Sequence, residues 1–84
     1  MRTVTVYSTE ACQACDQVKG MLSARDIPYE EIVVPPDSPE LEELVQRSGM
    51  MTLPQVYVGA ILVGGNVETI AAASSGMLAD LLID

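Results

Sequence analysis

The chain has 84 residues, 49% of them hydrophobic, and twelve acidic side chains against four basic ones give it a net charge of −8. A chain of this length forms a single small domain, which we expect to span residues 1–84. With so few basic residues, it lacks the cationic surface that nucleic acid binding requires and the basic amphipathic helix of a membrane-surface protein. No apolar run approaches the roughly 20 residues of a membrane span. We therefore expect neither nucleic acid nor a membrane as a partner.

The N-terminal residues do not resemble a secretory leader. They alternate like a strand from residue 3, and they contain neither an apolar core region nor a cleavage site. We therefore expect a cytoplasmic protein. In a reducing compartment, cysteines are more often catalytic or metal-binding than permanently bridged.

The first half of the chain predicts a strand, a helix and a second strand. Residues 3–7 are rich in β-branched side chains and predict a buried strand. From Cys12 to about Arg25, apolar side chains recur every three or four residues, which predicts a helix. Pro28 limits that helix, because a proline disfavours helical backbone in the residue before it. Residues 29–34 predict the second strand.

The next segment predicts a helix followed by a hairpin. Ser38 is a suitable cap, Pro39 suits the first helical position, and Gly49 is a suitable left-handed residue at the end. Residues 55–59 and 61–63 predict two short strands joined by a tight turn.

The C-terminal segment predicts a further helix after the turn at residues 64–66. We expect this helix to carry the apolar residues Val67, Ile70 and Ala71. Gly76 interrupts this helix, and a final apolar turn or two follows.

The resulting order of elements is β-α-β-α-β-β-α, an α/β arrangement. The first β-α-β unit predicts a parallel pair of strands, and the hairpin adds two antiparallel ones. We therefore predict a thioredoxin-like fold, with a four-stranded mixed sheet flanked by helices.

Cys12 and Cys15 are the only cysteines, and they lie where the first strand gives way to the first helix. A cysteine at a helix N-terminus faces unpaired N–H groups and the positive end of the helix dipole, which favour the thiolate. Cys15 shares the same helix face but lies one turn deeper. We therefore predict a redox disulfide in which Cys12 is the nucleophile and Cys15 resolves the mixed disulfide. Glu10 and Asp16 flank the pair, and their negative charge opposes thiolate formation.

A metal site and a structural bridge are the alternative interpretations of this pair. Zinc takes four ligands, and the chain has no histidine and no second cysteine pair, so a site would need carboxylates or a second subunit. A bridge closing a four-residue loop would constrain the unfolded chain very little. We expect no bound metal.

Three motifs resemble the glutaredoxin family at matching separations. The segment VYSTEACQAC at 6–15 resembles the family's strand, loop and CxxC helix. The segment TLPQVYVG at 52–59 is similar to its Thr-Val-Pro segment, and VGGNVETI at 63–70 to its Gly-Gly turn. The resemblance implies a dithiol enzyme, a thiol–disulfide oxidoreductase that reduces protein disulfides and glutathione mixed disulfides.

The resemblance also implies a binding site for glutathione. The Leu53–Pro54 bond would be cis, and the backbone there would pair with an extended substrate. Glutathione would act as a co-substrate, with no tightly bound cofactor. The positions that match the family's substrate-binding residues are Gln13, Ala14, Thr52, Leu53, Pro54, Gly65, Asn66 and Val67.

Several positions depart from the family pattern. Thr9 stands where the family usually has a basic residue, and Gln13-Ala14 replaces the usual Pro-Tyr between the cysteines. Val67 replaces a polar residue after the Gly-Gly turn, and Met50 replaces a basic residue found in some members. We therefore expect weaker glutathione binding and a less stabilised thiolate than in members with a lysine before the motif.

These departures leave three alternatives to glutathione-dependent reduction. The first is a redoxin of the ribonucleotide-reductase type, which takes electrons from thioredoxin reductase. The second is an iron–sulfur carrier, in which Cys12 of two subunits and two glutathiones would hold a cluster. The third is a thioredoxin-fold adaptor with incidental cysteines. We expect a monomer whose partners are disulfide-containing proteins, with ribonucleotide reductase among the candidates.

Overall fold

The computed structural model describes residues 1–83. The elements are β1 (Val4–Ser8), α1 (Gln13–Ala24), β2 (Tyr29–Val33), α2 (Pro39–Ser48), β3 (Gln55–Val58), β4 (Ile61–Gly64), α3 (Asn66–Ser75) and α4 (Met77–Leu82). They follow the predicted order, with the expected final apolar turn forming the short helix α4.

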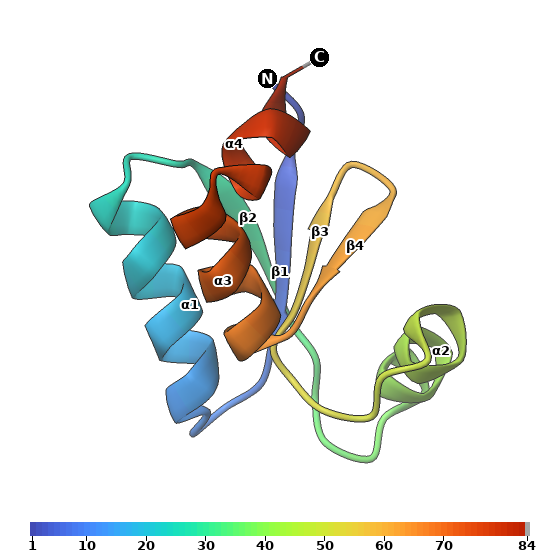
Figure 1. Cartoon of the computed structure of the whole chain (residues 1–84). Coiled ribbons are helices and arrows are strands. Elements are labelled where there is room, and N and C mark those ends of the chain that lie inside the picture. The colour runs from blue at the N-terminus through green and yellow to red at the C-terminus, as the bar shows by residue number, and fades with distance from the viewer. Residues whose placement is uncertain (84) are drawn as a thin grey trace.

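The four strands form one mixed sheet in the order β2-β1-β3-β4. β1 pairs with β2 in parallel and with β3 antiparallel, and β3 and β4 form the antiparallel hairpin. α1 and α3 cover one face of this sheet, and α2 lies beside the other (Figure 1). The predicted thioredoxin-like arrangement, a four-stranded mixed sheet flanked by helices, is confirmed.

Two hydrophobic clusters lie on opposite faces of the sheet. The larger contains Val4, Val6, Val18, Leu22, Val56, Val58, Ala72, Ala73, Leu78 and Leu82. The smaller contains Val34, Leu44 and Tyr57. Because successive strand residues point to opposite faces, Tyr57 faces α2 while its neighbours on β3 face α1 and α3. The larger cluster fixes the distance between α1 and the end of β1, where the cysteines lie.

The ends of α2 follow the predicted capping signals. The Ser38 side chain accepts a hydrogen bond from the Leu41 N–H at 3.1 Å, and Pro39 occupies the first helical position. Gly49 ends the helix with a φ of 73°, a left-handed conformation that glycine adopts without a steric penalty.

The predicted C-terminal helix is α3, and it carries Val67, Ile70 and Ala71 on its exposed side. Val67 and Ile70 are 72% and 37% exposed, and Ala71 is exposed as well. The buried side chains of α3 are Thr69, Ala72 and Ala73. They share a helix face at the same three- and four-residue spacing, but they are small. Small side chains let α3 pack closely on α1 and the sheet.

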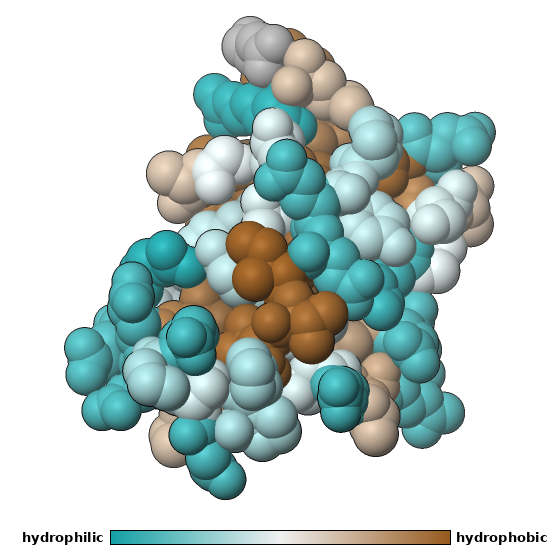
Figure 2. Space-filling view, turned by 180° about the vertical axis from the view of Figure 1, so that it is seen from behind, coloured by the Kyte–Doolittle hydropathy of each residue, from teal (hydrophilic) through white to brown (hydrophobic). Residues whose placement is uncertain are grey.

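The side of the molecule opposite α1 and α3 has a mostly hydrophilic surface, with one compact apolar patch near the centre of the view (Figure 2). β2 forms one edge of the sheet, and its Ile32 and Val33 are exposed. Within residues 1–83, no helix has both the length and the apolar character needed to cross a membrane.

A pair of substitutions tests the assignment of the core. Leu22 is fully buried in the larger cluster, so Leu22→Ala should lower the free energy of unfolding by about 2–5 kcal/mol. Ile70→Ala, on the exposed side of α3, should cost about 1 kcal/mol or less. Urea unfolding followed by circular dichroism measures both. Equal losses would contradict the observed orientation of α3.

Candidate active site

Cys12 is the N-cap residue of α1. Its backbone is extended, with φ −111° and ψ 100°, and its Sγ accepts a hydrogen bond from the Cys15 N–H at 3.1 Å. This N–H is one of the amides that a helix N-terminus leaves without an intrahelical partner. The sulfur therefore lies where a backbone donor and the positive end of the helix dipole both stabilise a thiolate.

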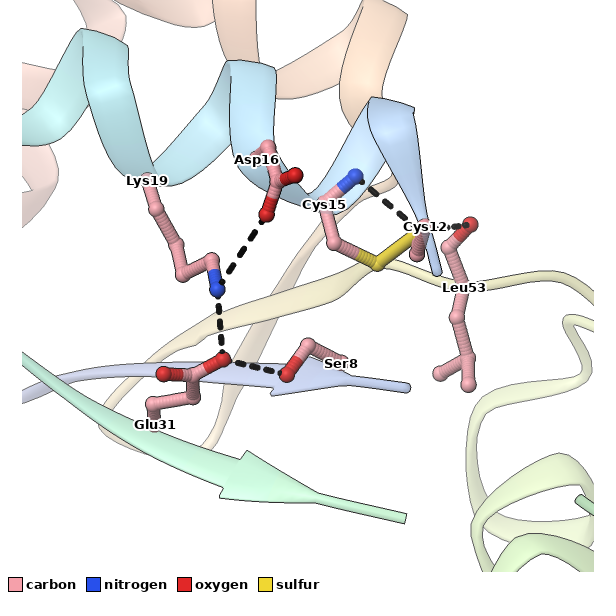
Figure 3. Close-up of polar contacts among 7 residues, drawn as sticks. All are labelled: Ser8, Cys12, Cys15, Asp16, Lys19, Glu31 and Leu53. Carbon is pink, nitrogen blue, oxygen red and sulfur yellow. Dashed lines mark hydrogen bonds and ion pairs between the residues drawn. A yellow bond between two sulfur atoms is a disulfide. The ribbon is translucent and has the colours of Figure 1, made fainter. Parts of the chain in front are cut away.

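The two cysteines differ in exposure and are joined by a disulfide (Figure 3). Cys12 is half-buried, whereas Cys15 is 1% exposed and belongs to the buried face of α1. An external reagent or substrate can therefore reach Cys12, while Cys15 is accessible mainly to its neighbour.

The Leu53–Pro54 segment lies beside the disulfide. Cys12 Sγ lies 4.0 Å from the Leu53 carbonyl oxygen, although 41 residues separate them in sequence (Figure 3). The Leu53–Pro54 peptide bond is cis, as the resemblance implies. The backbone of this segment and the reactive sulfur thus share one side of the molecule.

A groove of about 350 Å³ runs next to this segment. Its lining residues are Ala14, Met50, Thr52, Leu53, Pro54, Gly65, Asn66, Val67 and Glu68. Seven of the eight positions that the resemblance assigned to substrate binding are therefore brought together. Gln13 is exposed and does not line the groove.

Glu68 is a groove residue that the sequence reasoning missed. Its Oε1 accepts a hydrogen bond from the Gly65 N–H at 2.8 Å, which caps the start of α3. A Cβ on Gly64, whose φ is 132°, would lie 2.6 Å from the Glu68 Cβ, so this approach requires a glycine. A glutamate three residues after a helix cap is a recognised capping signal and could have identified this contact.

A second contact ties the groove to α1. The Asn66 side-chain amide donates a hydrogen bond to the Gln17 Oε1 at 2.8 Å. The start of α3 is therefore fixed relative to the helix that carries the cysteines.

Lys19 forms a polar network beneath the cysteines. Its Nζ lies 2.7 Å from the Glu31 Oε2 and 3.5 Å from an Asp16 carboxylate oxygen. The buried Ser8 hydroxyl donates to the same Glu31 oxygen at 2.6 Å (Figure 3). The hydrogen bond to Glu31 is the main cause of a raised pKa for Lys19, so this cation is already engaged by carboxylates.

The same network affects the carboxyl group at its centre. Hydrogen bonds, first from Lys19 and then from Ser8, lower the pKa of Glu31 below its usual range. Glu31 on β2 bonds to Lys19 on α1 and to Ser8 at the end of β1. These contacts hold α1, which carries the cysteines, against the ends of the two strands.

Within residues 1–83, no three side chains of histidine, cysteine, aspartate or glutamate gather as a metal-binding group. The two cysteines of the chain are joined to each other in a disulfide.

A thioredoxin-like fold with a CxxC pair at the start of α1, facing a cis-proline segment, defines a thiol–disulfide oxidoreductase. The glutaredoxin family model matches residues 4–63. Glutaredoxin 3 of Escherichia coli K12 is 32% identical over 82 residues, which cover 98% of this chain and 99% of that protein. The chain belongs to the glutaredoxin family, and its activity is that of a thiol–disulfide oxidoreductase.

Solved glutaredoxin structures agree with this assignment. The glutaredoxin of Brucella melitensis superposes with a TM-score of 0.83 at 32% identity, covering 98% of this chain and 89% of that one. A glutaredoxin–glutathione complex from buckwheat superposes with a TM-score of 0.85 at 24% identity, covering 96% of this chain and 76% of that one. The second comparison supports the fold.

The network at Glu31 predicts a pH-dependent contribution to stability. A carboxyl group with a lowered folded-state pKa stabilises the fold above its unfolded pKa, about 4.5, and loses that contribution as the pH falls through its folded-state value. Glu31→Gln should therefore lower the urea midpoint at neutral pH, and the difference from the parent protein should vanish in acid.

Glu30→Gln is the matched control, because Glu30 is the exposed neighbour of Glu31 on β2. It should leave the midpoint nearly unchanged across the same pH range. A Glu31→Gln difference that persists undiminished well below pH 4 would contradict the role of the charged network.

Proposed function

We propose that Cys12 is the attacking thiolate and Cys15 the resolving thiol in the reduction of protein disulfides and glutathione mixed disulfides. The main supporting observation is the Cys12 Sγ itself. It is half-buried at the start of α1, accepts the Cys15 N–H and faces the Leu53 carbonyl, whereas Cys15 is buried.

The reaction starts from the reduced dithiol. The Cys12 thiolate attacks one sulfur of the substrate disulfide, that S–S bond breaks, and the leaving sulfur takes up a proton. Cys15 then loses its proton and attacks the Cys12 sulfur of the mixed disulfide. This step releases the second substrate thiol and leaves the Cys12–Cys15 disulfide seen in the structure. Two electrons pass to the substrate, and an external thiol donor restores the dithiol.

The groove beside Cys12 holds an extended segment of the substrate. Thr52, Leu53 and Pro54 offer backbone groups on one side, and Ala14 and the start of α3 close the other side. Pairing with the Leu53 backbone resembles the addition of a strand to a sheet edge, which needs no particular substrate side chain. Such a contact would orient the substrate disulfide toward the Cys12 sulfur.

Glutathione binds in the same groove but more weakly than in members with basic residues there. The structure of the buckwheat glutaredoxin, which has the same fold, is a complex with glutathione, and this supports glutathione as a co-substrate of this chain. The N–H groups of Asn66 and Val67 are available for its γ-glutamyl carboxylate, since Glu68 already engages the Gly65 N–H. Each missing charge-assisted hydrogen bond costs about 1.5–3 kcal/mol where the site is desolvated.

The groove also supports a choice of electron donor, because its residues match the positions that the resemblance assigns to glutathione. We propose a cytoplasmic protein that accepts electrons from glutathione, with thioredoxin reductase as the alternative donor. Protein disulfides, including that of ribonucleotide reductase, are the candidate substrates.

Single cysteine substitutions separate the two roles. Cys12→Ser should abolish all turnover, because no other described thiol is accessible. Cys15→Ser should abolish protein-disulfide reduction, since nothing then resolves the mixed disulfide, while part of the activity on a glutathionylated peptide remains. A Cys12→Ser protein that still reduces either substrate would overturn the assignment of Cys12.

A comparison of two donor systems on one protein disulfide identifies the physiological route. One system supplies NADPH, glutathione reductase and glutathione, and the other supplies NADPH and thioredoxin reductase. Oxidation of NADPH is followed by its absorbance. We expect turnover with glutathione, at a higher glutathione concentration for half-maximal rate than Escherichia coli Glutaredoxin 3 requires. Turnover with thioredoxin reductase alone would contradict glutathione as the donor and would favour a redoxin of the ribonucleotide-reductase type.

A further inference from the structure

The four basic side chains are arranged so that none is free at the end of the molecule that carries the cysteines. Arg2 precedes β1, and its backbone N–H bonds to the Leu82 carbonyl of α4 at 3.0 Å. Arg25 is the C-cap of α1, so the 12 residues of the helix, about 18 Å of length, separate it from Cys12. Both therefore lie at the end of the molecule opposite the start of α1 (Figure 1).

The other two basic side chains are engaged by local partners. Lys19 is bound by the carboxylates of Glu31 and Asp16. Arg47 donates a hydrogen bond to the Tyr7 hydroxyl at 2.9 Å and stacks over the rings of Tyr7 and Tyr57, on the face of the sheet that packs against α2.

Acidic side chains, in contrast, surround the cysteines. Glu10 is exposed two residues before Cys12, and the side chain of Asp16 is 77% exposed on the first turn of α1. Glu68 is exposed at the start of α3, on the other wall of the groove. These three carboxylates come from the loop before α1, the first turn of α1 and the start of α3, the segments that carry the cysteines and one wall of the groove.

The rest of the groove rim is uncharged. Met51 and Val67 are 82% and 72% exposed, the two most exposed large hydrophobic residues of the described chain. Met51 belongs to the segment that leads to Pro54, and Val67 lines the groove at the start of α3. No described residue lining the groove is basic, so no cationic side chain of the rim attracts an acidic substrate.

We infer that this protein selects disulfides that are flanked by lysine or arginine, and that it discriminates against acidic ones. The inference rests on the proposed function of Cys12 and names the class of substrate that this site favours. Like charges around a reactive group repel an acidic partner and attract a basic one, which changes the rate of encounter by factors of about 10 to 10³ at low salt. The carboxylates of Glu10, Asp16 and Glu68 supply this field. Lys19 pairs with Asp16 and offsets part of it, and no residue that lines the groove adds a positive side chain.

Two synthetic peptides test the inference. Each contains one intramolecular disulfide, and the two differ only in having lysine or glutamate beside the cysteines. The fully reduced protein is mixed with each oxidised peptide, and the second-order rate constant of reduction is measured in a single turnover. Flanking charge also changes the reactivity of the peptide disulfide itself, so the same two peptides are reduced by dithiothreitol as a reference. The lysine-to-glutamate rate ratio obtained with the protein is divided by the ratio obtained with dithiothreitol, which gives the normalised ratio.

The normalised ratio should favour the lysine peptide by about tenfold or more at an ionic strength of about 0.01 M. It should fall toward one at about 1 M, where the screening length is only about 3 Å. A normalised ratio near one at low salt, or one that salt does not change, overturns the inference. Failure of the reduced protein to reduce either peptide contradicts the proposed function of Cys12 as well.

A pair of charge variants locates the field. Glu10→Lys should lower the normalised low-salt ratio by about threefold or more, since it reverses a charge next to the site. Asp80→Lys makes the same change in net charge at an exposed residue of α4, at the opposite end of the molecule. It should alter the ratio by less than about twofold. A shift in Cys12 reactivity would affect both peptides alike and cancel in the ratio. Equal effects of the two variants would show that net charge alone acts, and would overturn the assignment to this site.

Discussion

The hydrogen bond from the Cys15 N–H to the Cys12 sulfur is the interaction on which the chemistry of this protein depends. It exists because α1 begins at Cys12, so that the first amides of the helix have no carbonyl partner within the helix. The same geometry places Cys15 one turn deeper, in the buried face of α1. One helix start therefore provides an accessible, stabilised sulfur and a shielded partner, which is the asymmetry that dithiol exchange requires.

The surroundings of the Cys12 sulfur act on the stability of its thiolate in opposite directions. The amide and the helix dipole favour the thiolate, whereas Glu10 and Asp16 oppose it, and Lys19 is engaged by Glu31 and cannot compensate fully. With the selectivity that we infer, the same acidic side chains that oppose ionisation of Cys12 also favour the approach of basic substrates. Reactivity and selectivity therefore have a common physical origin in the charges placed at one end of a thioredoxin-like fold.

Local signals in the sequence predicted the element order, the capping at Ser38 and Gly49, and the location of Cys12 at a helix start, because each depends on residues within one turn. The buried face of α3 was not predicted, because close packing against α1 and the sheet selects the small residues Ala72 and Ala73 over larger apolar ones. The link between Lys19 and Glu31 was not predicted, because it depends on the parallel register of β2 beside β1, and no local pattern specifies that register. The groove was predicted only from the resemblance to glutaredoxins. Its walls come from residues far apart in the sequence, near Cys12 and near Pro54, and no local pattern indicates that they lie side by side.

The most direct test of the central claim is alkylation of the fully reduced protein with limiting iodoacetamide as a function of pH, with the modified residue identified by mass spectrometry. Cys12 should react first, with a midpoint below the value of about 8.5 that is usual for a free thiol, yet well above 4 because of the neighbouring carboxylates. Equal modification of Cys15, or a Cys12 midpoint no lower than that of a free thiol, would contradict the account.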